Sequence, residues 1–266
     1  MTDQLVPQNV YSNLPYVYDD AGFSAYALEY TPIFLNFLQK TGWIGRRILD
    51  LGCGTGVSLE FFSGQRMMMT GVDVSEGMID VSRQRLEAAS VDATLVCEDV
   101  RRYMPVEKAF DLVISIGDVM NYISSVRDLE GIFQRVNYGL EMGRTFLFDL
   151  RTLRSLAEDF GQKTQELVNK EDLYVVVRNR YDYETQTLAQ HFTFFYQDEE
   201  QPNYIRAEEN HILRGYPFRA VTTMLARAGF EVKHALDLNL NAFDPDKDPH
   251  GRVVILAEKV RDLPGT

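Results

Sequence analysis

The sequence has few cysteines and no long apolar run, and each shortage excludes a class of protein. Only two cysteines, Cys53 and Cys97, occur in 266 residues, so we expect neither a disulfide framework nor a zinc site. No stretch reaches the roughly 18 apolar residues that a membrane-spanning helix needs. The N-terminus lacks the basic and apolar regions of an export signal. We therefore expect a cytoplasmic protein without a membrane anchor.

Positive charge is also scarce. Lys and Arg total 27 against 39 Asp and Glu, which gives a formal net charge of -12. An acidic surface repels a phosphate backbone, so nucleic acid is a disfavoured partner. His191, His234 and His250 are far apart in the sequence, and the acidic run at 244–248 is typical of a solvated turn. No metal site is predicted.

Strand and helix patterns alternate along most of the chain. Buried strand patterns occur at 47–51, 67–73, 94–97, 110–115 and 145–149. Amphipathic helix patterns occur at 24–40, after Ser75 and around 129–140. This alternation predicts parallel β-α-β units, whose ligand crevice lies outside the carboxyl ends of the strands.

From about residue 171 to 215 the pattern changes. Runs with strand character follow one another without helices, at 173–177, 188–196 and 204–208, and they predict an inserted antiparallel sheet. A helix after Pro217 and strand patterns at 230–236 and 252–257 then complete the main sheet. The predicted fold is α/β: a Rossmann-like, doubly wound, seven-stranded and mostly parallel sheet at 1–150 and 216–266, with an antiparallel β subdomain inserted at 151–215.

Three glycines follow the first strand. Gly52, Gly54 and Gly56 precede a predicted helix, so bare backbone N–H groups and a helix N-terminus become accessible to a ligand. A tight turn without a ligand would use the same residues. Asp73 ends the second strand, where its carboxylate can accept hydrogen bonds from both hydroxyls of a ribose. It could instead cap the helix that begins after Ser75.

The residues around the glycines distinguish between nucleoside cofactors. A dinucleotide-binding G-x-G-x-x-G motif needs Gly or Ala at position 57, where the chain has Val57. Asp50 precedes the glycines, and its carboxylate attracts an ammonium or sulfonium group but repels a pyrophosphate. The pattern therefore favours S-adenosylmethionine and leaves a nicotinamide oxidoreductase as the weaker alternative. Asp99 and Val100, after the third strand, offer a carboxylate and an N–H suited to adenine.

These motifs resemble, in the same order, those of class I S-adenosylmethionine-dependent methyltransferases. The matching segments are Asp50-x-Gly52-x-Gly54-x-Gly56, Asp73, Glu98-Asp99-Val100 and 110–115. The closer resemblance is to bacterial small-molecule methyltransferases with an inserted antiparallel sheet, including N,N-dimethyltransferases of nucleotide-linked amino sugars and glycine N-methyltransferase-like enzymes. It implies S-adenosyl-L-methionine as cofactor and S-adenosyl-L-homocysteine as product.

The resemblance also implies roles for individual residues. The glycine turn would surround the methionine part, Asp73 would hold the ribose, and Met78 would pack on the adenine, while Tyr18 and Asp19 would close over the cofactor. The cofactor-binding residues implied are Tyr26, Asp50, Gly52, Cys53, Gly54, Gly56, Asp73, Val74, Met78, Asp99, Val100 and Ser115.

Two further segments resemble the substrate side of these enzymes. The stretch 116–122 implies that Asp118, Asn121 and Tyr122 lie beside the transferring methyl, and the stretch 211–217 adds His211 and Arg214. An amine acceptor must lose a proton, so His211 and Asp118 are candidate proton acceptors, and Tyr18 and Tyr122 are candidates to orient the amine.

The predicted activity is methyl transfer to a small-molecule acceptor, with an amine nitrogen favoured, by in-line displacement. The inserted sheet and the N-terminal segment would form a lid that excludes water. A non-catalytic S-adenosylmethionine sensor or partner-binding module remains as an alternative, whereas RNA methylation conflicts with the acidic charge. Exposed edges of the inserted sheet, paired across a two-fold axis, would give a homodimer.

Overall fold

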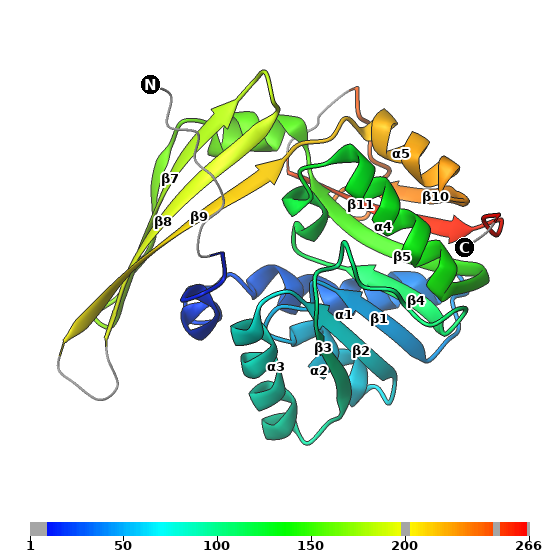
Figure 1. Ribbon diagram of the computed structural model, residues 1–266, viewed down its shortest axis with the longest axis horizontal. Coiled ribbons are helices and arrows are strands. Elements are labelled where there is room, and N and C mark those ends of the chain that lie inside the picture. The colour runs from blue at the N-terminus through cyan, green and yellow to red at the C-terminus, as the bar shows by residue number, and fades with distance from the viewer. Residues whose placement is uncertain (1–9, 198–202, 247–250, 265–266) are drawn as a thin grey trace.

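The computed structural model describes residues 10–197, 203–246 and 251–264. The predictions made above for the extreme N-terminus and for His250 lie outside these ranges. Two β-sheets dominate the described structure, one with seven strands and one with four (Figure 1). None of the helices in the described ranges is long and apolar enough to cross a membrane.

The seven-stranded sheet confirms the predicted main sheet. Its strand order is β10-β11-β5-β4-β1-β2-β3, and its parallel pairs are β1 with β2 and β4, β2 with β3, and β4 with β5. Only β11 runs antiparallel to its neighbours β5 and β10. The bounds are β1 Arg47–Leu51, β2 Met68–Asp73, β3 Ala93–Cys97, β4 Phe110–Ser115, β5 Leu140–Arg151, β10 Phe230–Leu236 and β11 Arg252–Lys259.

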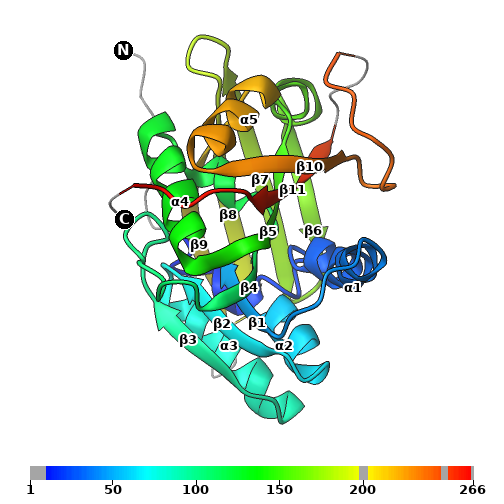
Figure 2. The same cartoon turned by 90° about the vertical axis from the view of Figure 1, so that its right-hand side faces the viewer.

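Helices cover both faces of this sheet, as expected for a doubly wound fold (Figure 2). Alternate side chains of a strand point to opposite faces, so Ile48 joins the core formed with α1, α2 and α3 whereas Leu49 joins the core formed with α4 and α5. The bounds are α1 Ala25–Lys40, α2 Val57–Gly64, α3 Glu76–Ala89, α4 Val126–Gly139 and α5 Phe218–Arg227.

The inserted antiparallel sheet is also confirmed, with the order β6-β7-β8-β9. Its strands are β6 Thr164–Asn169, β7 Leu173–Asp182, β8 Thr187–Gln197 and β9 Tyr204–Arg214. The prediction missed β6, because Thr-Gln-Glu-Leu-Val-Asn shows no clear apolar alternation, and it ended β7 at residue 177, five residues early. Residues 155–160 form one turn of π-helix before β6.

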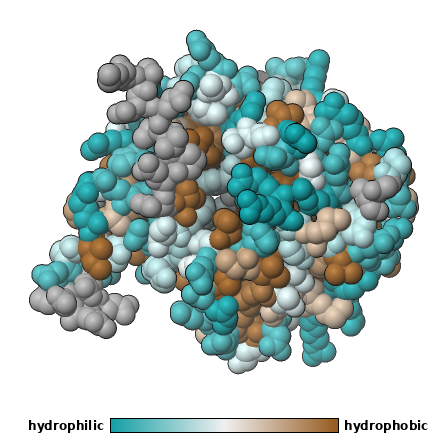
Figure 3. All heavy atoms as spheres, in the orientation of Figure 1, coloured by the Kyte–Doolittle hydropathy of each residue, from teal (hydrophilic) through white to brown (hydrophobic). Residues whose placement is uncertain are grey.

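The N-terminal segment packs against the inserted sheet. Leu14 and Val17, on a 3-10 helix at Leu14–Val17, share an apolar cluster with Val175, Phe192 and Phe194. The chain then returns through α1 to the main sheet. On the face in Figure 3, hydrophilic residues surround small separate apolar groups.

Candidate active site

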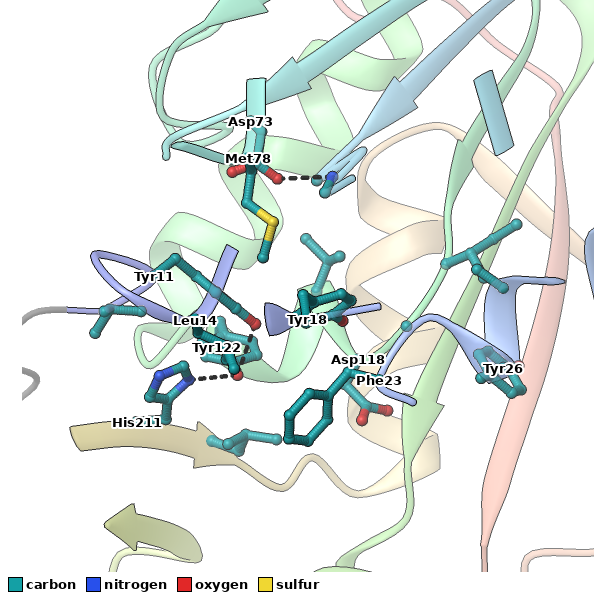
Figure 4. A pocket seen from close by; sticks show the side chains of 18 of the residues that line it. Tyr11, Leu14, Tyr18, Phe23, Tyr26, Asp73, Met78, Asp118, Tyr122 and His211 are labelled. Atoms are coloured by element: carbon teal, nitrogen blue, oxygen red, sulfur yellow. Dashed lines mark hydrogen bonds between the residues drawn. The ribbon is translucent and has the colours of Figure 1, made fainter. Parts of the chain in front are cut away.

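A cavity of about 600 Å³ lies where the main sheet, the inserted sheet and the N-terminal segment meet. Its floor is formed by residues that follow the carboxyl ends of β1, β2 and β4, as the parallel topology requires. The inserted sheet supplies the opposite wall, and Tyr11, Leu14 and Tyr18 lie between the two (Figure 4).

The three glycines of the turn differ in the space that surrounds their Cα atoms. All three have positive φ, at +76° for Gly52, +53° for Gly54 and +81° for Gly56. A Cβ on Gly52 would lie 2.5 Å from Val119, and one on Gly56 would overlap Ser82. A Cβ on Gly54 would meet nothing within 4 Å, although Gly54 lines the cavity. Packing therefore requires two of the glycines, and Gly54 leaves open space for a ligand.

Two buried carboxyl groups lie beside this turn. Asp73 accepts hydrogen bonds from the backbone N–H groups of Gly54, at 3.0 Å, and Ser75, at 2.9 Å. Ser75 itself caps α3 through Met78, so Asp73 is not the helix cap. Asp50 has no hydrogen bond within the described ranges and is 2% exposed. Burial, followed by the charge of Asp73, raises the pKa of Asp50 to about 8.

Asp99 forms an ion pair with the guanidinium group of Arg101. The Arg101 Nε atom donates to both Asp99 carboxylate oxygens, at 3.0 and 2.9 Å. Burial alone would raise the pKa of Asp99, but the hydrogen bonds from Arg101 hold it below its usual value. Val100 and Met78 also line the cavity. The lining therefore combines an ionised acid with apolar side chains.

Asp118 belongs to a cluster of four charged side chains. One carboxylate oxygen of Asp118 accepts a hydrogen bond from Arg151 Nε at 2.7 Å, and Arg252 donates to both oxygens. Arg252 also binds Asp149, which accepts the N–H of Gly117 at 2.7 Å. Two guanidinium groups therefore bind the Asp118 carboxylate, and its predicted role as a proton acceptor stays a prediction.

Four side chains, two of them partly buried and two fully buried, form a hydrogen-bonded chain across the cavity. The Tyr11 hydroxyl donates to the Tyr122 hydroxyl at 2.9 Å, and the Tyr122 oxygen lies 2.8 Å from His211 Nδ1 (Figure 4). His211 Nε2 lies 2.9 Å from a carboxylate oxygen of Glu209. A neutral imidazole carries one N–H, and the carboxylate can only accept, so Nε2 carries the proton and Nδ1 accepts from Tyr122. Burial raises the pKa of the Tyr122 phenol, which keeps that donor protonated.

Glu209 also fixes the N-terminal segment. It accepts the backbone N–H groups of Tyr11, Asn13 and Leu14 at 2.9, 2.7 and 2.8 Å. Burial raises the pKa of Glu209, but the hydrogen bonds from His211 and these N–H groups bring it below its ordinary value. An ionised carboxylate on β9 thus holds the segment that covers the cavity.

The same segment is attached to the cofactor side of the fold. Asp19 accepts hydrogen bonds from Thr55, in the glycine turn, at 2.9 Å and from Arg85 at 2.5 Å. The Ser75 hydroxyl donates to the Tyr11 carbonyl at 2.9 Å. The N-terminal segment therefore bridges both sheets.

The cavity brings together most of the residues that the sequence predicted. The predicted residues that line it are Tyr18, Tyr26, Asp50, Gly52, Cys53, Gly54, Asp73, Val74, Met78, Asp99, Val100, Asp118, Tyr122 and His211. The hydroxyl of Tyr26 is buried and has no hydrogen-bond partner in the described part of the chain. Like the open space at Gly54, this unpaired hydroxyl suits a bound ligand.

Five predicted residues lie outside the cavity lining, and one of them is Asp19, described above. Gly56 is packed against α3, as described above, and the Ser115 hydroxyl donates to the Leu51 carbonyl at 2.8 Å inside the sheet. Asn121 bonds the backbone of Arg151 and Arg214. The Arg214 guanidinium donates to the Ser124 carbonyl and lies 5.4 Å from the ring centroid of Tyr216. These side chains support the cavity wall from outside.

Sequence reasoning missed Tyr11, Glu209, Arg151, Arg252 and Asp149. A signal existed for the last three, because each is a charged residue within or at the end of an apolar strand, as in Phe148-Asp149-Leu150. A charge in such a run needs a partner. The partners of these three charges could not be predicted from the sequence, because paired residues lie up to 134 positions apart.

Comparison with known proteins identifies the class to which this fold and cavity correspond. Residues 48–143 match the sequence model of a family described as "Methyltransferase domain". The matched residues include the glycine turn, Asp73 and Asp99, so the floor of the cavity belongs to a methyltransferase domain, and the two-sheet fold is shared with solved S-adenosylmethionine-dependent methyltransferases. The match favours S-adenosylmethionine over the nicotinamide cofactor of the alternative prediction.

Individual relatives agree with this class. YqeM of Bacillus subtilis (strain 168), provisionally named a methyltransferase, is 25% identical over 254 residues, which cover 96% of this chain and 99% of YqeM. An S-adenosylmethionine-dependent methyltransferase from Clostridium acetobutylicum ATCC 824 has a similar structure, with a TM-score of 0.82 and 21% identity over 95% of this chain and 100% of its own. CalS10, an amino pentose methyltransferase from Micromonospora echinaspora, was solved with S-adenosylmethionine bound and gives a TM-score of 0.62 at 18% identity, covering 98% of this chain and 100% of its own.

Proposed function

We propose that this protein methylates an amine nitrogen of a small molecule and that the buried chain from Tyr11 to Glu209 takes up the proton that the amine loses. The observation that carries this proposal is the unbroken hydrogen bonding of Tyr11, Tyr122, His211 and Glu209 at the cavity. An amine loses a proton on methylation at neutral pH, so a buried acceptor with a stabilised cationic form suits this acceptor class.

The residues on the floor of the cavity fit S-adenosylmethionine. The open space at Gly54 admits a ligand close to the backbone, and Asp73 keeps lone pairs for the two ribose hydroxyls. Asp50, which has no partner among the described residues, faces the site expected for the ammonium and sulfonium charges. The cofactor supplies an activated methyl group. Met78 and Val100 would enclose its adenine, with Asp99 sharing its oxygens between Arg101 and the exocyclic amine.

The inserted sheet would enclose the acceptor. Val177, Leu188 and Phe192 present apolar side chains to the cavity from β7 and β8. Together with Tyr18 of the N-terminal segment, they would exclude water from the reacting groups. We propose residues 151–215 as the subdomain that covers the acceptor, because its sheet and the N-terminal segment are joined by Glu209.

The proton would move by successive transfers along the chain of hydrogen bonds. The Tyr11 oxygen would accept the N–H proton of the methylated amine while its own proton passes to Tyr122. The Tyr122 proton would pass to His211 Nδ1, which leaves both phenols neutral and His211 as an imidazolium. Glu209 would stabilise that cation at 2.9 Å.

A methylation assay with defined amines tests this proposal. Purified protein is incubated with methyl-labelled S-adenosylmethionine and a pool of primary and secondary amines together with matched alcohols, and S-adenosylhomocysteine and labelled products are measured by mass spectrometry. We expect transfer to nitrogen. His211→Asn should lower turnover about 10²-fold or more while S-adenosylhomocysteine still binds.

The matched control is His191→Asn, because His191 lies on the same sheet, bonds Asn210 and does not line the cavity. It should leave turnover unchanged. Transfer to alcohols alone, or full activity of His211→Asn, would contradict the proposed acceptor and proton path. Tight cofactor binding with no transfer to any member of the pool would instead favour the non-catalytic sensor.

A further inference from the structure

Arg151 presents an unused part of its guanidinium group to the cavity. Its Nε atom donates to Asp118 at 2.7 Å, and its Cζ atom lies 4.5 Å from the ring centroid of Phe160, in the π-helical turn. Within the described ranges, its two terminal amino groups contact no acceptor. By contrast, the Arg252 guanidinium uses its terminal groups on Asp118 and Asp149 and has an 8% exposed side chain, against 24% for Arg151.

A row of polar side chains crosses the inserted sheet on the cavity side. Asn179, Gln190 and His211 lie directly opposite one another on β7, β8 and β9. Gln190 donates to Asn179 at 3.0 Å, and Asn179 donates to Gln165 at 3.2 Å. Both glutamines line the cavity. An amide side chain has two N–H donors and an acceptor oxygen, more than these bonds use, so this row suits a ligand with polar substituents.

We propose, on the basis of the amine methylation proposed above, that the acceptor carries a carboxylate or phosphate group and that Arg151 binds it. The two terminal amino groups of an arginine form a planar fork that matches two oxygens of either anion. The two positive charges of Arg151 and Arg252 offset the two negative charges of Asp118 and Asp149. The cluster therefore has no net negative charge that would repel an anion. The amide row would bind polar substituents between the anion and the amine.

The position of Arg151 in the sheet indicates that the anion it binds belongs to the methyl acceptor and not to the cofactor. Arg151 ends β5, and β4 separates β5 from β1, which leads into the glycine turn. At about 4.8 Å between neighbouring strands, β5 lies roughly 10 Å from β1. Arg151 also contacts Phe160 of the inserted segment. The remaining alternative source of a carboxylate is the methionine part of the cofactor, and the experiment below separates the two.

Binding and turnover are measured on the full chain and on three variants. Protein saturated with S-adenosylhomocysteine is titrated calorimetrically with inorganic phosphate and with acetate. We expect both anions to bind the wild-type complex, and Arg151→Gln to bind them about tenfold more weakly or worse. Arg151→Lys, which keeps the charge but loses the fork, should fall between the two. Arg154→Gln is the matched control, because Arg154 does not line the cavity.

Turnover is then compared for amines that differ only in an anionic group, such as glucosamine and glucosamine 6-phosphate or glycinamide and glycine. The wild-type protein should prefer the anionic member of a pair by about tenfold or more in kcat/KM. Arg151→Gln should lose this preference, so that its kcat/KM for the anionic member becomes similar to that for the neutral member. Retained binding of S-adenosylhomocysteine shows that the variant is folded.

Three outcomes would overturn the proposal. One is anion binding that is absent or is unchanged in Arg151→Gln. Another is a tenfold loss of S-adenosylhomocysteine affinity in that variant, which would assign Arg151 to the cofactor carboxylate. The third is methylation of amines with no dependence on their charge or on Arg151. If no amine is methylated but anion binding still depends on Arg151, the amine methylation fails and the anion site stands.

Discussion

The phenol oxygen of Tyr122 and the Nδ1 atom of His211 lie 2.8 Å apart, and this hydrogen bond connects the two sheets. Tyr122 belongs to the turn that follows β4 of the main sheet, whereas His211 lies on β9 of the inserted sheet. The bond forms inside the cavity. The proposed proton path therefore exists only when both sheets and the N-terminal segment are assembled.

Removing the Tyr122 hydroxyl should interrupt this path. Tyr122→Phe keeps the ring but leaves Tyr11 and His211 without their common partner, so we expect kcat for an amine to fall about 10²-fold. Binding of S-adenosylhomocysteine, measured by calorimetry, should stay within about twofold, because the hydroxyl bonds Tyr11 and His211 and not the floor of the cavity. Tyr183→Phe serves as control, since Tyr183 is 72% exposed. Equal loss of kcat in both variants would argue against a specific role for Tyr122.

Neutralising Glu209 should loosen the N-terminal segment. In Glu209→Gln the amide nitrogen replaces one of the acceptors that bind Tyr11, Asn13, Leu14 and His211. We expect a loss of about 2–3 kcal/mol in the free energy of unfolding at pH 7, measured by urea denaturation. Proteolysis near residues 11–23 should become faster. Glu208→Gln, at the partly buried neighbouring position, should change neither quantity appreciably, because Glu208 makes no contact with the N-terminal segment in the described ranges.

The stabilisation by Glu209 should also depend on pH. Its pKa is lowered in the folded protein, so its contribution is complete above the unfolded value of about 4.3 and is lost as the pH falls through the folded value. The difference in unfolding free energy between wild type and Glu209→Gln should therefore shrink below about pH 4.3. A difference that stays constant to lower pH would show that the carboxylate is not the stabilising form.

The cofactor half of the site was predictable because its signals are local. Asp50, Gly54 and Asp73 lie within 24 residues of one another on a strand-turn-helix-strand pattern, and parallel strands bring their carboxyl ends to one edge. The face to which a side chain points was less predictable. Ser115 ends an apolar run and was predicted to bind the cofactor, but its hydroxyl donates to the Leu51 carbonyl within the sheet.

The other half depends on contacts between distant segments. Glu209 binds the N–H of Tyr11 across 198 positions, and no pattern in a single sequence shows such a pairing. Asp118 was predicted as a proton acceptor, and its partners Arg151 and Arg252 were missed for the same reason, since they come from two later strands. Pairing of the exposed edges of the inserted sheet into a homodimer stays a prediction.

Two glycines of the turn should respond differently to the same substitution. Gly56→Ala forces a Cβ into Ser82 at φ +81°, so we expect it to destabilise the fold by about 2–4 kcal/mol. Gly54→Ala meets open space at φ +53° and should cost about 1–2 kcal/mol of backbone strain. Its methyl group occupies part of the cofactor space, so S-adenosylhomocysteine should bind at least about tenfold more weakly. Thermal melts and calorimetry on both variants measure the two effects, and normal cofactor affinity of Gly54→Ala would place the cofactor elsewhere.

Asp50 should make cofactor binding depend on pH. Burial, together with Asp73, raises its pKa to about 8 in the ligand-free protein, so below that pH the carboxyl group must release its proton to pair with the cationic cofactor. The dissociation constant for S-adenosylmethionine should therefore fall by up to about tenfold per pH unit as the pH rises towards 8, and level off above it. Asp50→Asn should bind more weakly and lose this dependence.

The stability of the ligand-free protein gives an independent check on the same carboxyl group. A carboxyl whose folded-state pKa is raised destabilises the folded protein only where it must ionise, so the penalty is absent below the unfolded value of about 3.9 and is complete above about 8. Asp50→Asn should therefore unfold at higher urea concentration than wild type at pH 9, with the difference vanishing towards pH 4. The ammonium group of the cofactor also titrates near pH 8. Its titration affects cofactor binding to wild type and to Asp50→Asn alike, and it is absent from the urea unfolding of the ligand-free proteins. Parallel stability curves for the two proteins would show that Asp50 is ionised throughout, and the pH dependence of binding would then have to come from another group.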